Sequence, residues 1–183
     1  MKTFVIKKEH LDSDNYYVGS EDLSDFDGHI ESDENLGYVI FKNNISAKGY
    51  IYFKAGSGIK AGSGIKAGWG IKAGEGIEAG SGIKAGWGIK AGSGIKAGEG
   101  IECKLTLSCK LRIFAGLCIW KNPSEEEKTI TCGKLVSGNI AYGVLNEIGL
   151  PEDSNIDSKK KLLSKADELI AKANELKLQA EKL

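Results

Sequence analysis

The sequence predicts a mainly β fold organised around a short parallel β-helix, and three observations support this. Eight hexads follow one another from Phe53 to Ile101, and each is a variant of Ile-Lys-Ala-Gly-x-Gly. Within each hexad, Ile and Ala alternate with Lys or Glu, which is the period-2 pattern of a strand. Two Gly in every six residues disfavour a helix, and their spacing is not that of collagen. Such units bury an apolar face only by stacking on their neighbours.

The outward residues favour three hexads, or 18 residues, in each coil of a single-stranded solenoid. This period places Trp69 against Trp87 and sets Glu78 between Lys60 and Lys96, so the charges alternate along that face. A coil of two hexads would instead produce a ladder of like charge, which cross-strand energetics disfavour. That ladder would comprise Lys60, Lys72, Lys84 and Lys96.

The Ile-x-Ala-Gly-x-Gly pattern resembles the hexapeptide-repeat β-helices and the short polymer-forming β-helix proteins of bacteria. The usual hexapeptide motif has a small residue at the position that Ser57, Trp69, Glu75 and Trp87 fill here, so we expect this position to face outward. The segments DLSDFDGHIE, KAGxGIKAGWGIKAG and KLRIFAGLCIW also resemble small repetitive proteins of phages and prophages. This second resemblance implies a role in conflict between a phage and its host.

Length and composition predict one repeat domain with appended segments. The expected parts are an acidic segment with a β cap over 1–52, the hexapeptide β-helix over 53–102, a C-terminal β region over 103–150, a linker over 151–157 and a helix over 158–183. Residues 9–36 are expected to be irregular. The alternating residues of 103–150 are expected to form a sheet or sandwich-like cap on the coil.

The C-terminal segment carries a heptad pattern, which predicts an amphipathic α-helix with a coiled-coil seam. Such a helix cannot bury its seam alone, so the pattern indicates packing on the chain itself or self-association into a homo-oligomer. The residues of the seam are Leu162, Ala166, Leu169, Ala173, Leu176, Ala180 and Leu183.

Charge and hydropathy limit where the chain acts. Lys and Arg total 25, and Asp and Glu also total 25, but the span from Glu9 to Glu34 holds ten acidic residues and no Lys or Arg. An acidic segment of this kind is usually a solvated face. No apolar run reaches the length of a membrane span, and the first residues lack a signal-peptide pattern. We expect a protein of the bacterial cytoplasm, with its four Cys reduced.

Groups that could perform catalysis are scarce. The only two His are His10 and His29, both in the acidic segment, and no CxxC motif occurs. Cys103 and Cys109 fall on one side of a predicted strand, as small core residues would. The Gly-rich hexads match neither GxxxxGK nor GxGxxG, so no phosphate loop is expected. The sequence therefore predicts no catalytic residue, no metal and no cofactor.

The aromatic residues of the hexads predict a protein-binding patch. Trp is enriched at interface hot spots, and outward Trp residues aligned by the coil would form an apolar strip flanked by Lys. The alternative is that the C-terminal helix or the acidic segment covers this strip. The predicted interface comprises Trp69, Trp87, Lys72, Lys90, Tyr50 and Tyr52, with Trp120 as an extension.

These observations predict a non-enzymatic binding protein. The first hypothesis is a phage-encoded inhibitor of a host defence protein, such as a CRISPR–Cas nuclease, that presents a rigid face with segregated charge. The second hypothesis is a structural scaffold whose coils assemble end to end. The third is a protein that binds nucleic acid through its Lys rows, or mimics nucleic acid through its acidic segment.

Overall fold

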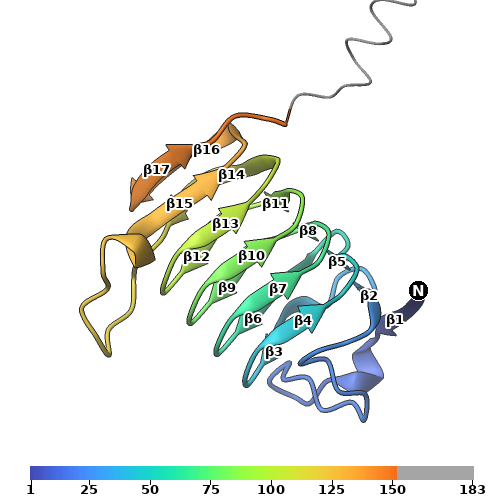
Figure 1. Ribbon diagram of the computed structural model, residues 1–183. Coiled ribbons are helices and arrows are strands. Elements are labelled where there is room, and N and C mark those ends of the chain that lie inside the picture. The colour runs from blue at the N-terminus through green and yellow to red at the C-terminus, as the bar shows by residue number, and fades with distance from the viewer. Residues whose placement is uncertain (152–183) are drawn as a thin grey trace, which may run out of the picture. The chain divides into compact units, whose positions relative to one another are not determined.

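The computed structural model describes residues 1–151 of the chain, and these form a coil of short parallel strands (Figure 1). Two short 3-10 helices interrupt the coil, η1 (Lys8–His10) and η2 (Glu126–Lys128). The strands are β1 (Lys2–Ile6), β2 (Gly28–Ser32), β3 (Gly37–Phe41), β4 (Ile45–Ala47), β5 (Ile51–Tyr52), β6 (Ser57–Ala61), β7 (Ile65–Ala67), β8 (Ile71–Ala73), β9 (Ile77–Ala79), β10 (Ile83–Ala85), β11 (Ile89–Ala91), β12 (Ile95–Ala97), β13 (Ile101–Cys103), β14 (Thr106–Phe114), β15 (Thr129–Cys132), β16 (Lys134–Tyr142) and β17 (Val144–Glu147).

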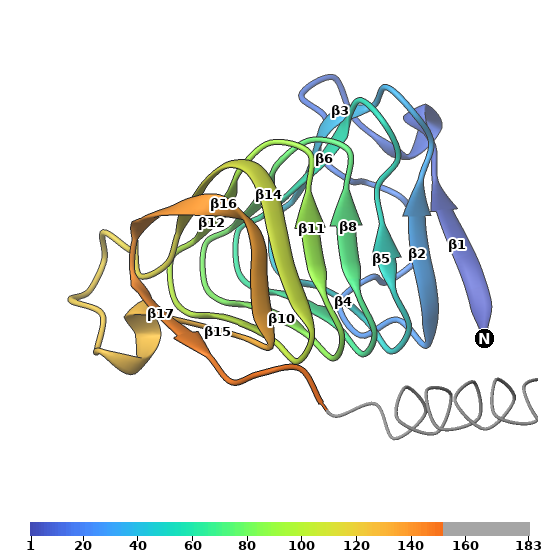
Figure 2. The same ribbon diagram turned by 90° about the horizontal axis from the view of Figure 1, so that it is seen from above.

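The strands form three faces, which Figure 2 shows from above. Face A contains β4, β7, β10, β13, β15 and β17 in spatial order. Face B contains β1, β2, β5, β8, β11 and the first part of β14, and face C contains β3, β6, β9, β12 and the second part of β14. The long strand β14 therefore turns from one face onto the next, and the pairs within each face are parallel.

The register confirms a parallel solenoid with three hexads in each coil. Ile65 pairs with Ile83 and Ile83 with Ile101, so equivalent residues lie 18 positions apart. The hexad Ile residues are at most 2% exposed, and the hexad Ala residues from Ala61 to Ala97 are at most 5% exposed, so both fill the interior. Burial of each Ile contributes roughly 2 kcal/mol to folding. The outward position holds the Lys and Glu residues.

The coil extends beyond the hexads at both ends. Residues 9–36, expected to be irregular, include strand β2, which pairs with β1 and β5. At the other end β15, β16 and β17 add further parallel rungs in place of the expected sheet or sandwich-like cap. Each of these strands pairs with a strand of the preceding coil, so a non-repeating sequence can continue the solenoid.

Two local expectations were also wrong. Ser57 was expected to face outward, but it is fully buried, and its Oγ accepts a hydrogen bond from the Leu36 N–H. The alternation expected from residue 103 onward, with Cys103 and Cys109 on the inner side, fails at Leu111, which is 61% exposed, because β14 changes face within its length.

The predicted fold class needs one correction, because it included a C-terminal α-helix. Residues 1–151 contain strands and two 3-10 helices but no α-helix, so the fold class is mainly β with parallel strands in curled sheets. The predicted helix over 158–183, with its seam from Leu162 to Leu183, lies outside the residues that the structure describes. No helix within the described range is long and apolar enough to span a membrane.

Candidate functional site

Four aromatic rings form a continuous ladder along face B. Trp69 and Trp87 stack with their ring centroids 5.1 Å apart and their planes 9° from parallel. His29 lies 4.9 Å from Trp69 and stacks on Tyr50 at 4.0 Å. The ladder exists because residues on successive coils lie at the spacing of a parallel sheet, which suits stacked aromatic rings. We call His29, Tyr50, Trp69 and Trp87 the aromatic ladder.

Hydrogen bonds fix the N-terminal half of the aromatic ladder. The Tyr50 hydroxyl donates to Glu31 Oε1 at 2.6 Å, and the Tyr50 backbone N–H donates to His29 Nδ1 at 3.1 Å. The hydrogen bond to Glu31 raises the pKa of Tyr50, with a further contribution from burial. The phenol therefore stays protonated at neutral pH, and Tyr50 is held against the coil that precedes it.

The C-terminal half of the ladder is open to solvent. Trp69 is 37% exposed and Trp87 is 52% exposed, beside a shallow depression of about 430 Å³. Lys72 and Lys90 pair in register along the same face, and Lys72 Nζ lies 4.6 Å from the centre of the Tyr52 ring. Neither lysine forms a salt bridge with any residue in 1–151. The surface therefore combines exposed aromatic area with unneutralised positive charge.

The structure brings the six predicted interface residues together. The depression is lined by Tyr50, Tyr52, Trp69, Lys72, Trp87 and Lys90. Within residues 1–151, the acidic segment does not bury the two Trp residues, although it contributes two side chains to one end of the ladder. That these residues bind a partner stays a prediction.

Sequence reasoning missed two residues of this surface and misplaced a third. His29 and Glu31 were assigned to an irregular acidic segment, yet β2 places both beside Tyr50. The signal was present, because His29 precedes Ile30 as Tyr50 precedes Ile51, and Ile30 pairs with Ile51. Trp120 does not extend the ladder: it lies beside Gly98, near Lys60 and Lys96.

The described residues offer few groups for chemistry. No cluster of three or more His, Cys, Asp or Glu that could hold a metal occurs among residues 1–151. Cys103, Cys109 and Cys132 are buried, and burial raises the pKa of Cys103 to about 12. A thiol with so high a pKa is protonated and unreactive at neutral pH.

Comparison with known proteins identifies no relative: no protein-family model, no curated protein and no solved structure matches the chain.

Proposed function

We propose that this chain is a non-enzymatic protein-binding module, and that the aromatic ladder with Lys72 and Lys90 is its binding surface. The observation that supports this most directly is the exposed stack of Trp69 on Trp87 beside two lysines with no ion-pair partner in residues 1–151. Large aromatic side chains dominate the binding energy of protein interfaces. Positive charge at the edge of such a patch selects a partner with acidic side chains.

The scaffold suits binding because its surface is preorganised. Each ladder residue sits in or beside a strand that is hydrogen-bonded to both neighbouring coils, as when the Trp87 N–H donates to the Trp69 carbonyl at 3.0 Å. Binding to a surface that is already ordered avoids part of the entropic cost of association. A flat stacked pair of indoles also presents a large contact area with few rotatable bonds.

The finer proposal is that the partner is a host defence protein, such as a CRISPR–Cas nuclease, and that the chain is a phage-encoded inhibitor acting in the bacterial cytoplasm. Its support is the sequence resemblance to small repetitive phage proteins. Sequencing the genomic region around the reading frame tests it. Neighbouring phage genes would support this proposal, and a chromosomal region without phage genes would contradict it.

A comparative pull-down from bacterial lysate tests the binding surface. The Trp69→Ala/Trp87→Ala variant should lose a partner that the wild type retains, whereas Trp120→Ala should keep it. Trp120 is a suitable control because it is 61% exposed and lies away from the ladder. Equal recovery of the partner by all three proteins would contradict the assignment of the surface.

A second pair of variants tests the charge. Lys72→Glu/Lys90→Glu should weaken binding to the purified partner by about tenfold or more and reduce its salt dependence. Lys60→Glu/Lys96→Glu makes the same change at the same hexad position on face C, so it should bind normally. Equal weakening by the two variants would indicate a non-specific effect of net charge.

Self-assembly is a second candidate function, because the last described coil leaves an open edge. Every residue of β17 is exposed, including Val144 and Leu145, and Ile148 is 58% exposed. Exposed apolar edge strands pair readily with other chains. Light scattering and electron microscopy distinguish the candidates: filaments favour a scaffold, and a fixed small species favours the binding module. A Val144→Lys variant should not form filaments if the filaments assemble through this edge.

A further inference from the structure

Tyr38 occupies a slot on face C that the glycines of the coil create. Its ring lies across Gly58, where an added Cβ would stand 2.9 Å from the ring carbons, and its hydroxyl lies over Gly76. The Gly76 backbone N–H donates to Tyr38 Oη at 3.2 Å. Burial raises the pKa of Tyr38, so its phenol stays protonated at neutral pH. Tyr38 thus shows that a tyrosine ring fits in the slot above two successive glycines of a face, with its hydroxyl bound by a glycine N–H.

The same slot occurs on face A over Gly64 and Gly82, without an occupant among residues 1–151, while the Glu126 and Thr129 backbone oxygens lie beside Gly100. Gly64, Gly82 and Gly100 stand directly before the inward Ile of the next hexad, as Gly58 and Gly76 do on face C. An added Cβ on Gly64 or Gly82 would meet only the carbonyl oxygen of the next coil, at 3.3 and 3.2 Å. On Gly76 the equivalent Cβ would also stand 2.3 Å from the Tyr38 hydroxyl.

The backbone N–H groups of the face A slot are available as donors. Within the described residues, the N–H groups of Gly64, Gly82 and Gly100 donate to no acceptor, whereas that of Gly76 is bound by Tyr38. The three glycines are only partly buried. A ligand that reaches them replaces water with an acceptor oxygen, as Tyr38 does on face C.

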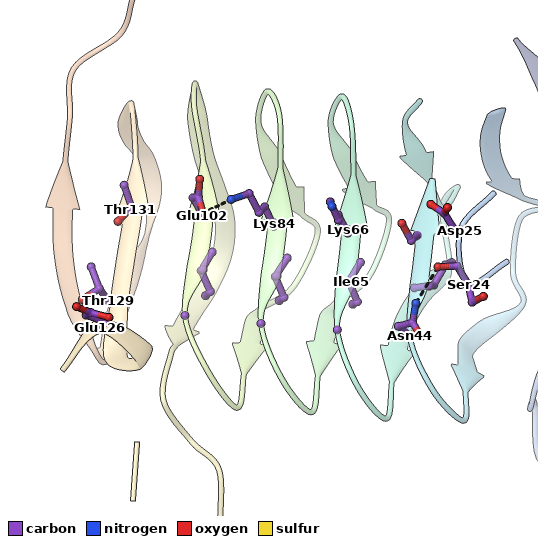
Figure 3. Close-up of a pocket in the computed structure, with 17 residues that line it drawn as sticks. Ser24, Asp25, Asn44, Ile65, Lys66, Lys84, Glu102, Glu126, Thr129 and Thr131 are labelled. Atoms are coloured by element: carbon purple, nitrogen blue, oxygen red, sulfur yellow. Dashed lines mark hydrogen bonds and ion pairs between the residues drawn. The ribbon is translucent and has the colours of Figure 1, made fainter. Parts of the chain in front are cut away.

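The difference between the two faces lies in one residue of the first coil. Tyr38 stands before Val39 at the head of the face C column, and Asn44 stands before Ile45 at the head of the face A column. Asn44 Nδ2 donates to the Ser24 carbonyl at 2.8 Å, so its short side chain is held at the end of the groove (Figure 3). Gly64 and Gly82 beyond it stay uncovered.

The charged side chains along this groove nearly balance. The groove has a volume of about 610 Å³, and the ion pair of Lys84 with Glu102 lies along one side, with Lys66 beside it (Figure 3). Asp25 lies at one end, and Glu126 lies at the other. This groove has no stacked indoles, so it suits a ligand whose ring carries a hydroxyl group better than a ligand with a large apolar surface.

We infer that the groove of Gly64, Gly82 and Gly100 binds a tyrosine side chain of a partner polypeptide. The partner ring lies flat across two glycines, its hydroxyl accepts a glycine N–H, and face A supplies a recognition site separate from the aromatic ladder. The inference rests on the Tyr38 arrangement and is independent of the proposed role of the ladder.

Nuclear magnetic resonance of the full ¹⁵N-labelled chain tests this inference, with N-acetyl-tyrosinamide as the probe. The amide signals of Gly64, Gly82 and Gly100 should shift in a saturable way, while that of Gly76 stays fixed because Tyr38 fills its slot. N-acetyl-phenylalaninamide should bind about fivefold more weakly, because it lacks the acceptor oxygen. Shifts confined to Gly70 and Gly88 would place the probe beside the ladder and overturn the inference.

Three variants test the slot itself. Asn44→Tyr should place a tyrosine over Gly64 and Gly82 from within the chain and abolish the response, whereas Asn44→Ala, which also loses the bond to Ser24, should keep it. Tyr38→Ala should make the Gly76 amide respond to the probe. The inference is overturned if Asn44→Tyr and Asn44→Ala respond alike in chains whose other amide signals show the native fold. It is also overturned if both probes shift the glycines equally.

Discussion

Gly74 and Gly92 lie one above the other in successive coils, so close that an added Cβ on Gly92 would stand 1.8 Å from the Gly74 carbonyl oxygen. From Gly62 onward, the first glycine of each hexad has this relationship to the coil before it, as for Gly86 over Gly68 at 1.9 Å. The second glycine has more room, since an added Cβ on Gly64 would meet one oxygen at 3.3 Å. The two glycines of a hexad therefore serve different purposes.

Substitution of these glycines should separate the two roles. Gly92→Ala should lower the free energy of unfolding by about 3 kcal/mol, because the coils must move apart to admit the methyl group. Gly64→Ala should change it by less than about 1 kcal/mol, because the cost of a small adjustment is offset by lower entropy in the unfolded chain. Urea unfolding followed by circular dichroism measures both, and equal losses would contradict the distinction.

The alternating charges on face C should contribute to stability. Glu78 lies between Lys60 and Lys96 in register, and Lys60 Nζ is 3.7 Å from Glu78 Oε2. Glu78→Lys should lower the free energy of unfolding by about 1 kcal/mol, because it aligns three like charges. Glu78→Gln is the matched control and should cost less. At 1 M salt the two variants should converge, since exposed charges are then screened.

The stack of Trp69 on Trp87 should appear as an energetic coupling between the two residues. A double-mutant cycle of Trp69→Ala and Trp87→Ala should give a coupling of about 1 kcal/mol in the free energy of unfolding. The same cycle with Trp69 and Trp120 should give none, because Trp120 lies near Gly98 instead. Thermal or urea unfolding measures both cycles, and a coupling near zero for the first would mean that the rings do not stack in solution.

The cysteines should differ sharply in reactivity. Cys103, Cys109 and Cys132 are buried, and Cys118 is partly exposed. Iodoacetamide at pH 8 should therefore modify Cys118 alone in the folded chain and all four thiols in denaturant, because the thiolate is the reacting form. Mass spectrometry after digestion identifies the modified residue. Rapid modification of Cys103 in the folded chain would contradict its burial.

Alkaline pH should destabilise the chain through Cys103. Burial raises its pKa from 9.0 to about 12, so between these values the folded chain holds a proton that the unfolded chain has lost. The stability contribution is complete below pH 9 and declines as the pH rises toward 12. Cys103→Ala should make the free energy of unfolding depend less on pH between pH 9 and pH 12. The measurement is the urea midpoint at a series of pH values, and equal slopes for the two proteins would exclude Cys103 as the cause.

The sequence by itself determined the middle of this protein. A six-residue pattern repeated eight times specifies the inward Ile and Ala, the outward charges and the three-hexad coil. Each unit forms its backbone hydrogen bonds with neighbouring copies of the repeat and buries its apolar face against them. The register of Ile65 with Ile83 and the stacking of Trp69 on Trp87 followed from that periodicity alone.

Only the tertiary structure decided the parts outside the repeat. It placed β2 beside β5, so that His29 and Glu31 join Tyr50, and it laid Tyr38 over Gly76, 38 residues away. Segments without a periodic pattern gain their strand conformation from the edge of the adjacent coil, which offers unpaired backbone groups and an apolar interior. That influence acts across space, so the local sequence of residues 9–36 and 103–150 does not by itself reveal which strand each segment pairs with.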